Sequence, residues 1–271
     1  MTLLDAIILG IVEGLTEFLP VSSTGHLILT SALLGLEGCA ADAYLIVIQF
    51  GAIAAVAVHY RQRLLAVLRG MMGKDKDGKK LALHLFLAFL PAAVVGLLFD
   101  DVIEEYFFSS LTVGIALVVG GVLMIVAERP PIARPPRREK LEDLTPVDAL
   151  LVGCAQCFAL WPGMSRSMST IVGGQLRGLS TPLAADFSFL LALPTLGAAT
   201  CYSALKNREE LLAMDGGLPV MAAGMVVSFL VAWAAIAWFL KVVKKIGMTP
   251  FGWYRIAVGI LVVVLVQLGM L

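Results

Sequence analysis

Charged residues are scarce in this chain. Only 15% of its 271 residues are charged, 59% are hydrophobic, and the mean hydropathy is +0.93. Soluble domains carry about 25% charged residues, so this composition excludes an ordinary soluble protein and predicts a polytopic membrane protein. Lys plus Arg and Asp plus Glu number 20 each. The balance excludes a strongly basic chain, and we expect no nucleic-acid partner.

Cysteine is also scarce and lacks the spacing of a metal or redox site. The four cysteines are Cys39, Cys154, Cys157 and Cys201. Cys154 and Cys157 form a CxxC, but no second pair and no adjacent histidine accompany it. We therefore interpret them as buried cysteines in apolar segments.

A basic leader is missing at the N-terminus. The first segment instead carries Asp5, Glu13 and Glu17. We expect it to be part of the mature fold rather than a cleaved signal peptide.

Long apolar runs are abundant. A membrane crossing takes roughly 20 apolar residues. Runs of this kind lie at 43–60, 82–99, 110–127, 182–205, 217–240 and 252–271. They predict six transmembrane helices.

Two further apolar segments, 2–35 and 148–179, are interrupted in the middle by proline followed by serines. Proline ends a helix and serine can cap the next one. Turn backbone is tolerated at membrane depth only inside protein or beside a wet cavity. Each segment is therefore predicted to be a re-entrant helix-turn-helix hairpin, and the expected fold class is an all-α polytopic membrane protein.

The two halves of the chain resemble each other at an offset of 142 residues. Pro20 aligns with Pro162, and Ser23 aligns with Ser165. This correspondence predicts an internal repeat. The predicted organisation is a single membrane domain, 1–271, with pseudo-repeats 1–128 and 147–271 joined by a cytoplasmic loop, 129–146.

Basic residues indicate the orientation of the spans. Loops 61–80, 128–147 and 241–251 hold seven, five and three Lys or Arg, whereas loops 36–42 and 100–109 hold none. Basic loops stay in the cytoplasm. With three spans in each half, the repeat must be inverted, so the first hairpin enters from outside and the second from the cytoplasm. We expect their tips to meet near the midplane, as in transporters built from broken helices.

Two acids, Glu13 and Glu17, lie one helical turn apart in the first hairpin. Like charges in an apolar helix are costly unless a positive group lies between them. One interpretation is a helix end in contact with water. The other is a site for Mg²⁺ or Ca²⁺, which bind carboxylate oxygens.

A hydroxyl cluster follows these acids. It consists of Ser22, Ser23 and Thr24, and His26 lies three residues after Ser23. The hydroxyls alone would indicate a helix cap. With His26 one turn along, the histidine could orient or deprotonate a hydroxyl, or attack phosphorus itself.

Arg166 lies at the tip of the second hairpin, beside Ser165, Ser167 and Thr170. A guanidinium at membrane depth needs an anion. That anion is either a glutamate of the first hairpin or a bound phosphate. The residues of the two tips together indicate metal-assisted phosphoryl transfer.

These motifs resemble those of the bacterial undecaprenyl-diphosphate phosphatases of the bacitracin-resistance BacA type. The resemblance covers essentially the whole chain. The first box reads EGLTEFLPVSSTGHLIL, and the second, PGxSRSGxT in the family, reads PGMSRSMST here. Met168 replaces the usual glycine.

The resemblance implies hydrolysis of undecaprenyl diphosphate to undecaprenyl phosphate and inorganic phosphate, which recycles the lipid carrier for peptidoglycan and gives bacitracin resistance. It also implies a multi-pass protein of the bacterial cytoplasmic (inner) membrane, with the active site open to the outer, periplasmic side. A divalent metal and membrane lipid are expected partners, and a homodimer is compatible with the sequence.

The resemblance implies roles for the site residues. Glu13 and Glu17 would hold the metal or position water, and Arg166 would neutralise the diphosphate. Ser23 and His26 would supply nucleophile and base, with Ser23 attacking after activation by His26, or with His26 attacking or activating water. The hydroxyls expected to bind substrate are Ser22, Thr24, Ser165, Ser167 and Thr170.

Two other functions compete with this one. A transporter or lipid flippase would also use inverted repeats, but it would not need a nucleophile beside a base. A structural membrane subunit would not need ionisable groups at two symmetric breaks. The hydrolase hypothesis predicts one cavity, open to the outside, on which four residues converge: Glu17, Ser23, His26 and Arg166.

Overall fold

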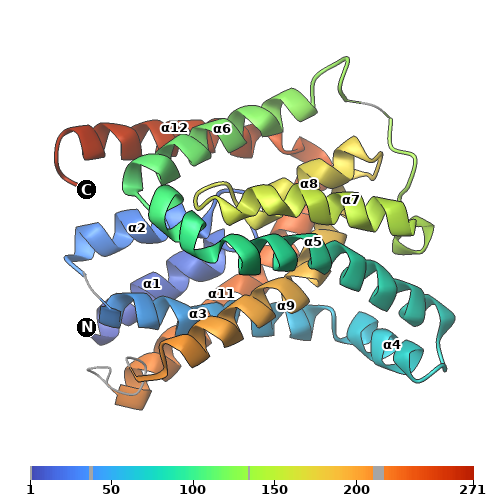
Figure 1. Cartoon of the computed structure of the whole chain (residues 1–271), viewed down its shortest axis with the longest axis horizontal. Coiled ribbons are helices and arrows are strands. Elements are labelled where there is room, and N and C mark those ends of the chain that lie inside the picture. The colour runs from blue at the N-terminus through green and yellow to red at the C-terminus, as the bar shows by residue number, and fades with distance from the viewer. Residues whose placement is uncertain (1, 37–38, 134, 210–216) are drawn as a thin grey trace.

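The computed structural model describes residues 2–36, 39–133, 135–209 and 217–271 (Figure 1). These residues form helices and turns, with one isolated parallel bridge between Arg138 and Leu179. The first half contains α1 (Leu3–Thr16), α2 (Ser23–Leu34), α3 (Cys39–His59), α4 (Arg61–Met71), α5 (Lys76–Phe107) and α6 (Ser110–Ala127). After the short helix η1 (Leu141–Asp143), the second half contains α7 (Pro146–Gln156), η2 (Cys157–Leu160), α8 (Arg166–Leu176), α9 (Thr181–Lys206), α11 (Gly217–Ile246) and α12 (Thr249–Gln267).

The predicted spans correspond to helices of suitable length. Within the described residues, five helices are long and apolar enough to cross a membrane, namely α5, α6, α9, α11 and α12. Tyr44–His59 and α4 would together count as a sixth span, and they are bent by 77° at the break between them. The all-α polytopic membrane fold is therefore confirmed, with five or six candidate spans among the described residues. One helix is longer than expected, because α5 continues past a kink at Phe99 to Phe107.

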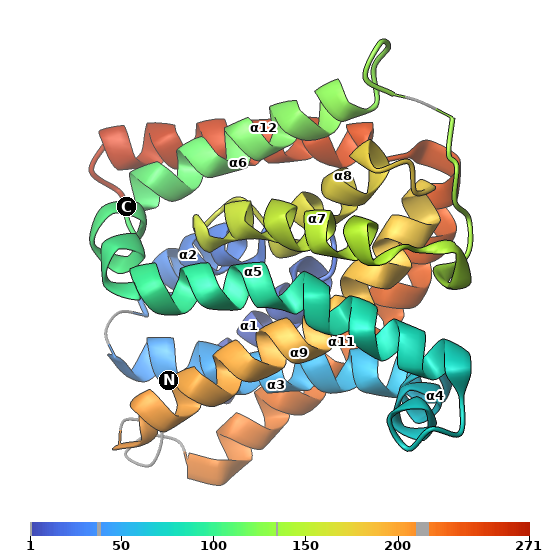
Figure 2. The same ribbon diagram turned by 45° about the vertical axis from the view of Figure 1, so that its right-hand side comes forward.

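The first helix of each hairpin packs against a long helix of the other half. α1 packs along α11 of the second half, and α7 packs along α5 of the first half. The last helices of the halves, α6 and α12, pack along each other, as both views show (Figures 1 and 2). Glycine permits this contact, because a Cβ at Gly121 would lie 2.6 Å from the carbonyl oxygen of Gly252. Small residues at such crossings let membrane helices approach closely.

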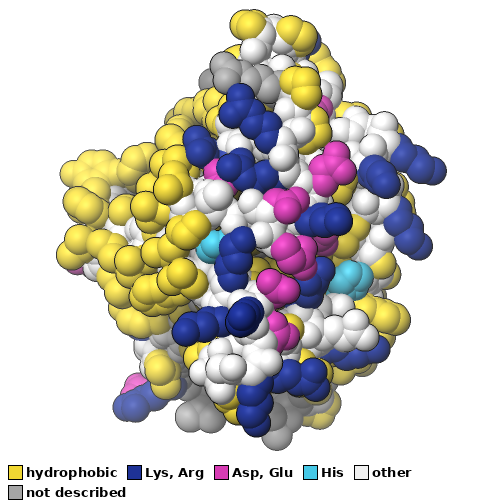
Figure 3. All heavy atoms as spheres, turned by 90° about the vertical axis from the view of Figure 1, so that its right-hand side faces the viewer, with side chains coloured by type: hydrophobic (Ala, Val, Ile, Leu, Met, Phe, Trp, Pro, Cys, Tyr) yellow, Lys and Arg dark blue, Asp and Glu magenta, His cyan; other side chains and the backbone are white. Residues whose placement is uncertain are grey.

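The hairpins open toward opposite ends of the molecule, as the inverted repeat predicts. The N-terminus and the end of α2 lie at one end, whereas α7 begins and α8 ends at the other (Figures 1 and 2). The second of these ends also carries α4, the segment after α6 and the junction of α11 with α12, so the basic loops share one face. Lys and Arg side chains are spread over this face in Figure 3. We refer to it as the basic face.

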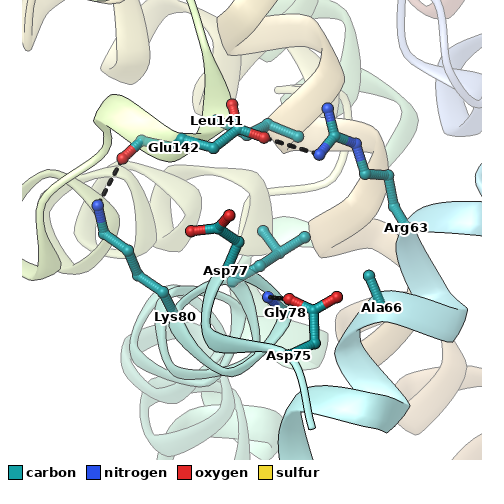
Figure 4. A pocket seen from close by; sticks show the side chains of 9 residues that line it. Arg63, Ala66, Asp75, Asp77, Gly78, Lys80, Leu141 and Glu142 are labelled. Carbon is teal, nitrogen blue, oxygen red and sulfur yellow. Dashed lines mark hydrogen bonds and ion pairs between the residues drawn. The ribbon is translucent and has the colours of Figure 1, made fainter.

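The segment between the halves is tied to both of them at the basic face. Glu142 accepts a 2.8 Å hydrogen bond from Arg63 of α4, and its carbonyl oxygen accepts a bond from Lys80 of α5 (Figure 4). On the other side, Arg138 forms an ion pair of 3.1 Å with Asp148, which is fully buried. Asp148 also pairs with Arg177 at 3.1 Å. These contacts fix the start of the second hairpin.

The two hairpin tips share an unusual backbone conformation. Ser22 and Ser165, the residues just before α2 and α8, both have positive φ, 72° and 71°. Among the described residues they are the only non-glycine residues with positive φ, and this conformation costs about 1–3 kcal/mol at a non-glycine residue. The repeat register at the tips is thus 143 residues, and the alignment of Ser23 with Ser165 was wrong by one. Ser23 corresponds in position to Arg166.

Two sequence interpretations need correction here. Ser165 caps α8 by accepting a bond from the Met168 amide, but Ser22 makes no side-chain cap bond. The cysteines are not all buried: Cys154 and Cys201 are exposed and Cys157 is half-buried. The helix surfaces of a membrane protein face lipid, so an apolar thiol there needs no protein cover. The side chain of Cys39 lies outside the described residues.

Candidate active site

The tips of the two hairpins enclose a cavity of about 140 Å³. The predicted residues that line it are Glu17, Ser22, Ser23, Thr24, Ser165 and Arg166. Gln49 of α3 and Leu196 of α9 complete its wall together with the turns of the tips. Six predicted site residues from two hairpins therefore meet at one cavity.

Glu17 lies between a hydroxyl and a guanidinium. Its Oε2 atom accepts a 2.6 Å hydrogen bond from Ser23 Oγ, and its Oε1 atom lies 3.6 Å from Arg166 Nη2. Glu17 and Arg166 are both buried, with side chains only 6% and 7% exposed. The carboxylate is thus placed to accept the proton of Ser23 while Arg166 balances its charge.

The guanidinium of Arg166 makes its hydrogen bonds within the described residues through Nη1 alone. Nη1 donates to the carbonyl oxygen of Ser188 at 2.9 Å and lies 3.3 Å from its hydroxyl. Nε and Nη2 are buried and have no hydrogen-bond partner. A buried N–H without a partner is costly. Nε and Nη2 form the fork that binds a phosphate through two parallel hydrogen bonds, and Nη2 also faces Glu17 Oε1 at 3.6 Å.

Aromatic side chains pack against the buried side of Arg166. The Arg166 guanidinium lies 5.7 Å from the ring centroid of Phe18, within range of a cation–π contact. Phe18 packs edge-on against Phe189 at 5.5 Å, and Phe189 contacts Phe239 at 5.8 Å. This aromatic cluster excludes water from the inner side of the ion pair and strengthens its electrostatics.

His26 is not part of the cavity, which corrects the predicted convergence of four residues. Its Nδ1 atom lies 2.8 Å from the Ser22 carbonyl oxygen, and its Nε2 atom lies 2.7 Å from the Tyr254 hydroxyl. A carbonyl can only accept, so Nδ1 carries the proton and Nε2 of a neutral ring accepts from Tyr254. Both nitrogens are therefore occupied, and the hydrogen bond of Ser23 goes to Glu17. His26 lies about one helical turn beyond Ser23, but its ring is directed to the Tyr254 hydroxyl of α12 and not into the cavity.

Other predicted hydroxyls are used inside the protein. Ser167 Oγ donates to the Leu19 carbonyl oxygen at 3.0 Å and so joins the two tips. Thr170 Oγ1 lies 2.6 Å from Ser188 Oγ. Neither residue lines the cavity. The hydrogen bond of Ser167 holds the two tips together, and that of Thr170 holds Ser188, the partner of Arg166. Neither hydroxyl is placed to contact a ligand in the cavity.

Met168 does not disturb the second tip. It lies in regular helix in α8 and is buried, with 1% of its surface exposed. The positive φ of this tip falls at Ser165, three residues earlier. Met168 therefore fills core space next to Gly120 without backbone strain.

Glu13 lies one turn before Glu17 and is 1% exposed. It does not line the cavity, and its Oε1 atom has no hydrogen-bond partner among the residues that the structure describes. An unsatisfied buried carboxylate oxygen is what a cation would neutralise. The described residues contain no cluster of three or more His, Cys, Asp or Glu that could hold a metal. Carboxylate oxygens are ligands for both Mg²⁺ and Ca²⁺, so the residues present fit either ion.

Arg255 of α12 is a site residue that the sequence analysis missed. It is fully buried. Its guanidinium donates to the carbonyl oxygens of Pro20 at 3.2 Å and Gly163 at 2.8 Å, one in each hairpin tip. It also donates to the carbonyl oxygens of Ala116 and Leu117 in α6. Arg255 thus connects both tips to α6 and α12.

A signal for this residue was present in the sequence. Arg255 is the only ionisable residue between Thr249 and Leu271 other than Tyr254, and a charge inside an apolar span marks a functional site. Ser188 carried no such signal, because a single serine in an apolar helix is ordinary.

Comparisons with known proteins identify the family of this chain. The sequence model described as "Bacitracin resistance protein BacA" matches residues 6–261. The chain is 56% identical over 259 residues to an "Undecaprenyl-diphosphatase" of Sorangium cellulosum, covering 95% of this chain and 84% of that protein. It is 47% identical over 268 residues to "Undecaprenyl-diphosphatase 1" of Stutzerimonas stutzeri, covering 99% and 95%. It is 46% identical over 272 residues to the "Undecaprenyl-diphosphatase" of Nitrosomonas europaea, covering 100% and 97%. This chain therefore belongs to the bacitracin resistance protein BacA family.

Proposed function

We propose that this protein hydrolyses undecaprenyl diphosphate to undecaprenyl phosphate and inorganic phosphate. It is a hydrolase of a polyprenyl diphosphate, and the activity recycles the lipid carrier of peptidoglycan synthesis and confers bacitracin resistance. The observation that carries the proposal is the arrangement of Ser23, Glu17 and Arg166 at one membrane-embedded cavity. The names of its relatives give the same substrate.

The geometry supports Ser23 as the nucleophile and Glu17 as its general base. Ser23 Oγ would attack the terminal phosphorus while its proton passes to Glu17 Oε2, 2.6 Å away. The bond between that phosphorus and the bridging oxygen breaks, and undecaprenyl phosphate leaves with the bond's electron pair. The terminal phosphoryl group then remains on Ser23.

Arg166 supports this step electrostatically. Its Nε and Nη2 atoms, which make no hydrogen bond to the described residues, would bind the phosphoryl oxygens as negative charge develops on them. The proton that Glu17 took from Ser23 passes to the departing undecaprenyl phosphate, so Glu17 can then accept the proton of a water molecule that attacks the phosphoserine. The bond between Ser23 Oγ and phosphorus breaks, Glu17 returns this proton to Ser23 Oγ, and inorganic phosphate leaves. Both half-reactions therefore use the same three residues.

Glu13 and Glu17 are the residues that would hold Mg²⁺. When bound, the ion would neutralise phosphate oxygens as a Lewis acid. The buried Oε1 atom of Glu13, which has no hydrogen-bond partner among the described residues, supports this assignment, and the same oxygen ligands suit Ca²⁺.

The activity is tested by phosphate release from undecaprenyl diphosphate, using detergent-purified protein with Mg²⁺. We expect wild type to release phosphate and chelator to stop it. Glu17→Gln should reduce kcat by about 10²–10⁴-fold, the usual contribution of a general base. Glu105→Gln, an exposed acid on α5, is the control and should be unchanged. No release by wild type, or full activity in Glu17→Gln, would overturn the proposal.

The multi-pass architecture supports a finer placement in the cytoplasmic (inner) membrane. We propose that the basic face lies in the cytoplasm and that the cavity opens to the periplasmic side. The grouping of the basic loops at one end of the molecule supports this orientation. Labelling of single cysteines placed in the α4–α5 turn and after α2 would check it. The homodimer stays a prediction.

Lipid translocation is the second candidate. The observation that favours it is the meeting of two oppositely directed broken hairpins, the arrangement of many transporters. Movement of undecaprenyl phosphate across liposomes by the Ser23→Ala variant would support it. Hydrolysis without such movement would exclude it.

A further inference from the structure

A second polar cavity lies at the basic face, at the sharp bend between α3 and α4. It measures about 330 Å³ and is lined by His59, Tyr60, Arg61, Gln62 and Arg63. We call it the elbow cavity. It lies on the residues where the chain leaves the membrane-spanning part of α3 and turns by 77°. It is therefore expected at the level of the lipid headgroups.

An apolar groove begins at the next residue of α4. It measures about 640 Å³ and lies between α4, α5 and α9. We call it the α4 groove. Leu64, Val67 and Met71 of α4 line one side, with Phe86 and Phe89 of α5 and Leu193 of α9 opposite. Its surface is almost wholly apolar, and its volume is within the roughly 300–1,000 Å³ of ordinary ligand pockets.

The charges around the elbow cavity favour an anion. Arg61 is exposed and has no hydrogen bond or ion pair among the described residues. Arg63 already forms an ion pair with Glu142, as Figure 4 shows. Asp186, the nearest acid on α9, already accepts a 2.5 Å bond from the Tyr60 hydroxyl. Arg61 is thus the cation that a ligand in this cavity would meet.

The sequence of α4 places these two features in register. Arg61 and Leu64 are three residues apart, and Leu64, Val67 and Met71 continue the same helical face. One stripe of α4 therefore presents a cation followed by an apolar wall. A phosphodiester headgroup with an acyl chain has the same order of polar and apolar parts.

We propose that the elbow cavity and the α4 groove together bind one anionic phospholipid of the cytoplasmic leaflet. Its headgroup phosphate pairs with Arg61, and an acyl chain occupies the α4 groove beneath α4. A zwitterionic lipid fits the groove equally well, but it carries an ammonium group that Arg61 repels. The site is distinct from the cavity of Glu17 and Arg166, and it needs no hydrolytic activity.

The proposal is tested by lipid binding to the full chain in nonionic detergent, followed by native mass spectrometry. Dioleoyl phosphatidylglycerol and dioleoyl phosphatidylcholine are titrated separately. We expect Arg61→Gln to weaken binding of the first phosphatidylglycerol about fivefold, since a basic residue near a lipid surface contributes about 1 kcal/mol. Phosphatidylcholine should bind more weakly to wild type and be unaffected by Arg61→Gln.

Matched variants separate this site from general adsorption. Lys244→Gln removes an exposed charge elsewhere on the basic face and should change phosphatidylglycerol binding less than twofold. Ala82→Phe fills the α4 groove and should weaken it at least fivefold, whereas Ala222→Phe on exposed α11 surface should not.

Three results would overturn the proposal. The first is equal binding of the two lipids to wild type, and the second is an equal loss in Lys244→Gln and Arg61→Gln. The third is displacement of phosphatidylglycerol by millimolar inorganic phosphate with no effect of Ala82→Phe, which would assign the cavity to a free anion.

Discussion

Ser23 donates its hydroxyl hydrogen to Glu17 across the turn of the first hairpin, at 2.6 Å. The two residues lie on either side of the break in the helix, so the turn itself brings the hydroxyl to the carboxylate. Arg166 approaches the same carboxylate from the opposite hairpin. The pairing of Ser23 with an acid instead of His26 determines the predictions below.

His26 should be less important for the chemistry than Ser23. Both its ring nitrogens have partners outside the cavity, Ser22 and Tyr254. We expect His26→Gln to retain phosphate release within about tenfold of wild type, and Ser23→Ala to lose at least about 10³-fold, as nucleophile removal does in other hydrolases. Tyr254→Phe should resemble His26→Gln. Equal losses in His26→Gln and Ser23→Ala would restore the histidine as base.

Ser188 should act as a positioning residue for Arg166. Its hydroxyl lies between Arg166 Nη1 and Thr170 Oγ1. Ser188→Ala should raise KM about fivefold with little change in kcat, which corresponds to the loss of one hydrogen bond of about 1 kcal/mol. Ser188→Thr, which keeps the hydroxyl, should restore KM.

Ser228→Ala is the matched control for this measurement. Ser228 is fully buried in α11, and its hydroxyl has no hydrogen-bond partner in the described part of the chain. Its removal should leave both constants unchanged. A fall in kcat with unchanged KM in Ser188→Ala would contradict the positioning role.

Arg255 should be needed both for the stability of the fold and for activity. Arg255→Met leaves buried carbonyl oxygens in both tips without a donor, and each such group costs about 1–3 kcal/mol. We expect a lower Tm in detergent and loss of phosphate release. Arg69→Met, an exposed arginine of α4, should change neither.

Arg255→Lys separates position from stability. A lysine keeps the buried charge, but one ammonium cannot reproduce the fork that reaches Pro20 and Gly163 together. We expect its Tm to recover more than its kcat. Full recovery of kcat by lysine would show that the two tips do not depend on this contact.

Met168 should contribute to stability rather than to catalysis. Met168→Gly removes a buried side chain and adds glycine to a helix, which together cost about 3 kcal/mol or more. We expect a clear fall in Tm, with phosphate release per folded molecule within twofold of wild type. A more stable or much more active glycine variant would contradict the regular helix at this position.

The sequence was sufficient to predict the helical membrane architecture, because the length and hydropathy of an apolar run indicate a membrane helix. The breaks at Pro20 and Pro162 predicted the hairpins, and the basic loops predicted their opposite directions. Six residues of the cavity followed from polar side chains at those breaks. These signals are local, so one chain is enough to reveal them.

The partners of each side chain depended on packing that spacing does not specify. Ser23 and His26 are close in sequence, yet the helix turns the imidazole toward Tyr254. Arg255 lies more than 230 residues from Pro20, and only the contact of α12 with α6 brings it to the tips. Long-range contacts of this kind are set by the fold as a whole.

The identity of the nucleophile is tested most directly by trapping the phosphorylated enzyme. Undecaprenyl diphosphate labelled in its terminal phosphate is mixed with the protein, and turnover is stopped with acid at successive times. The account predicts label attached to Ser23 through an acid-stable phosphoester, absent from Ser23→Ala. Acid-labile label on His26, or release of phosphate with no labelled protein at any time, would contradict it.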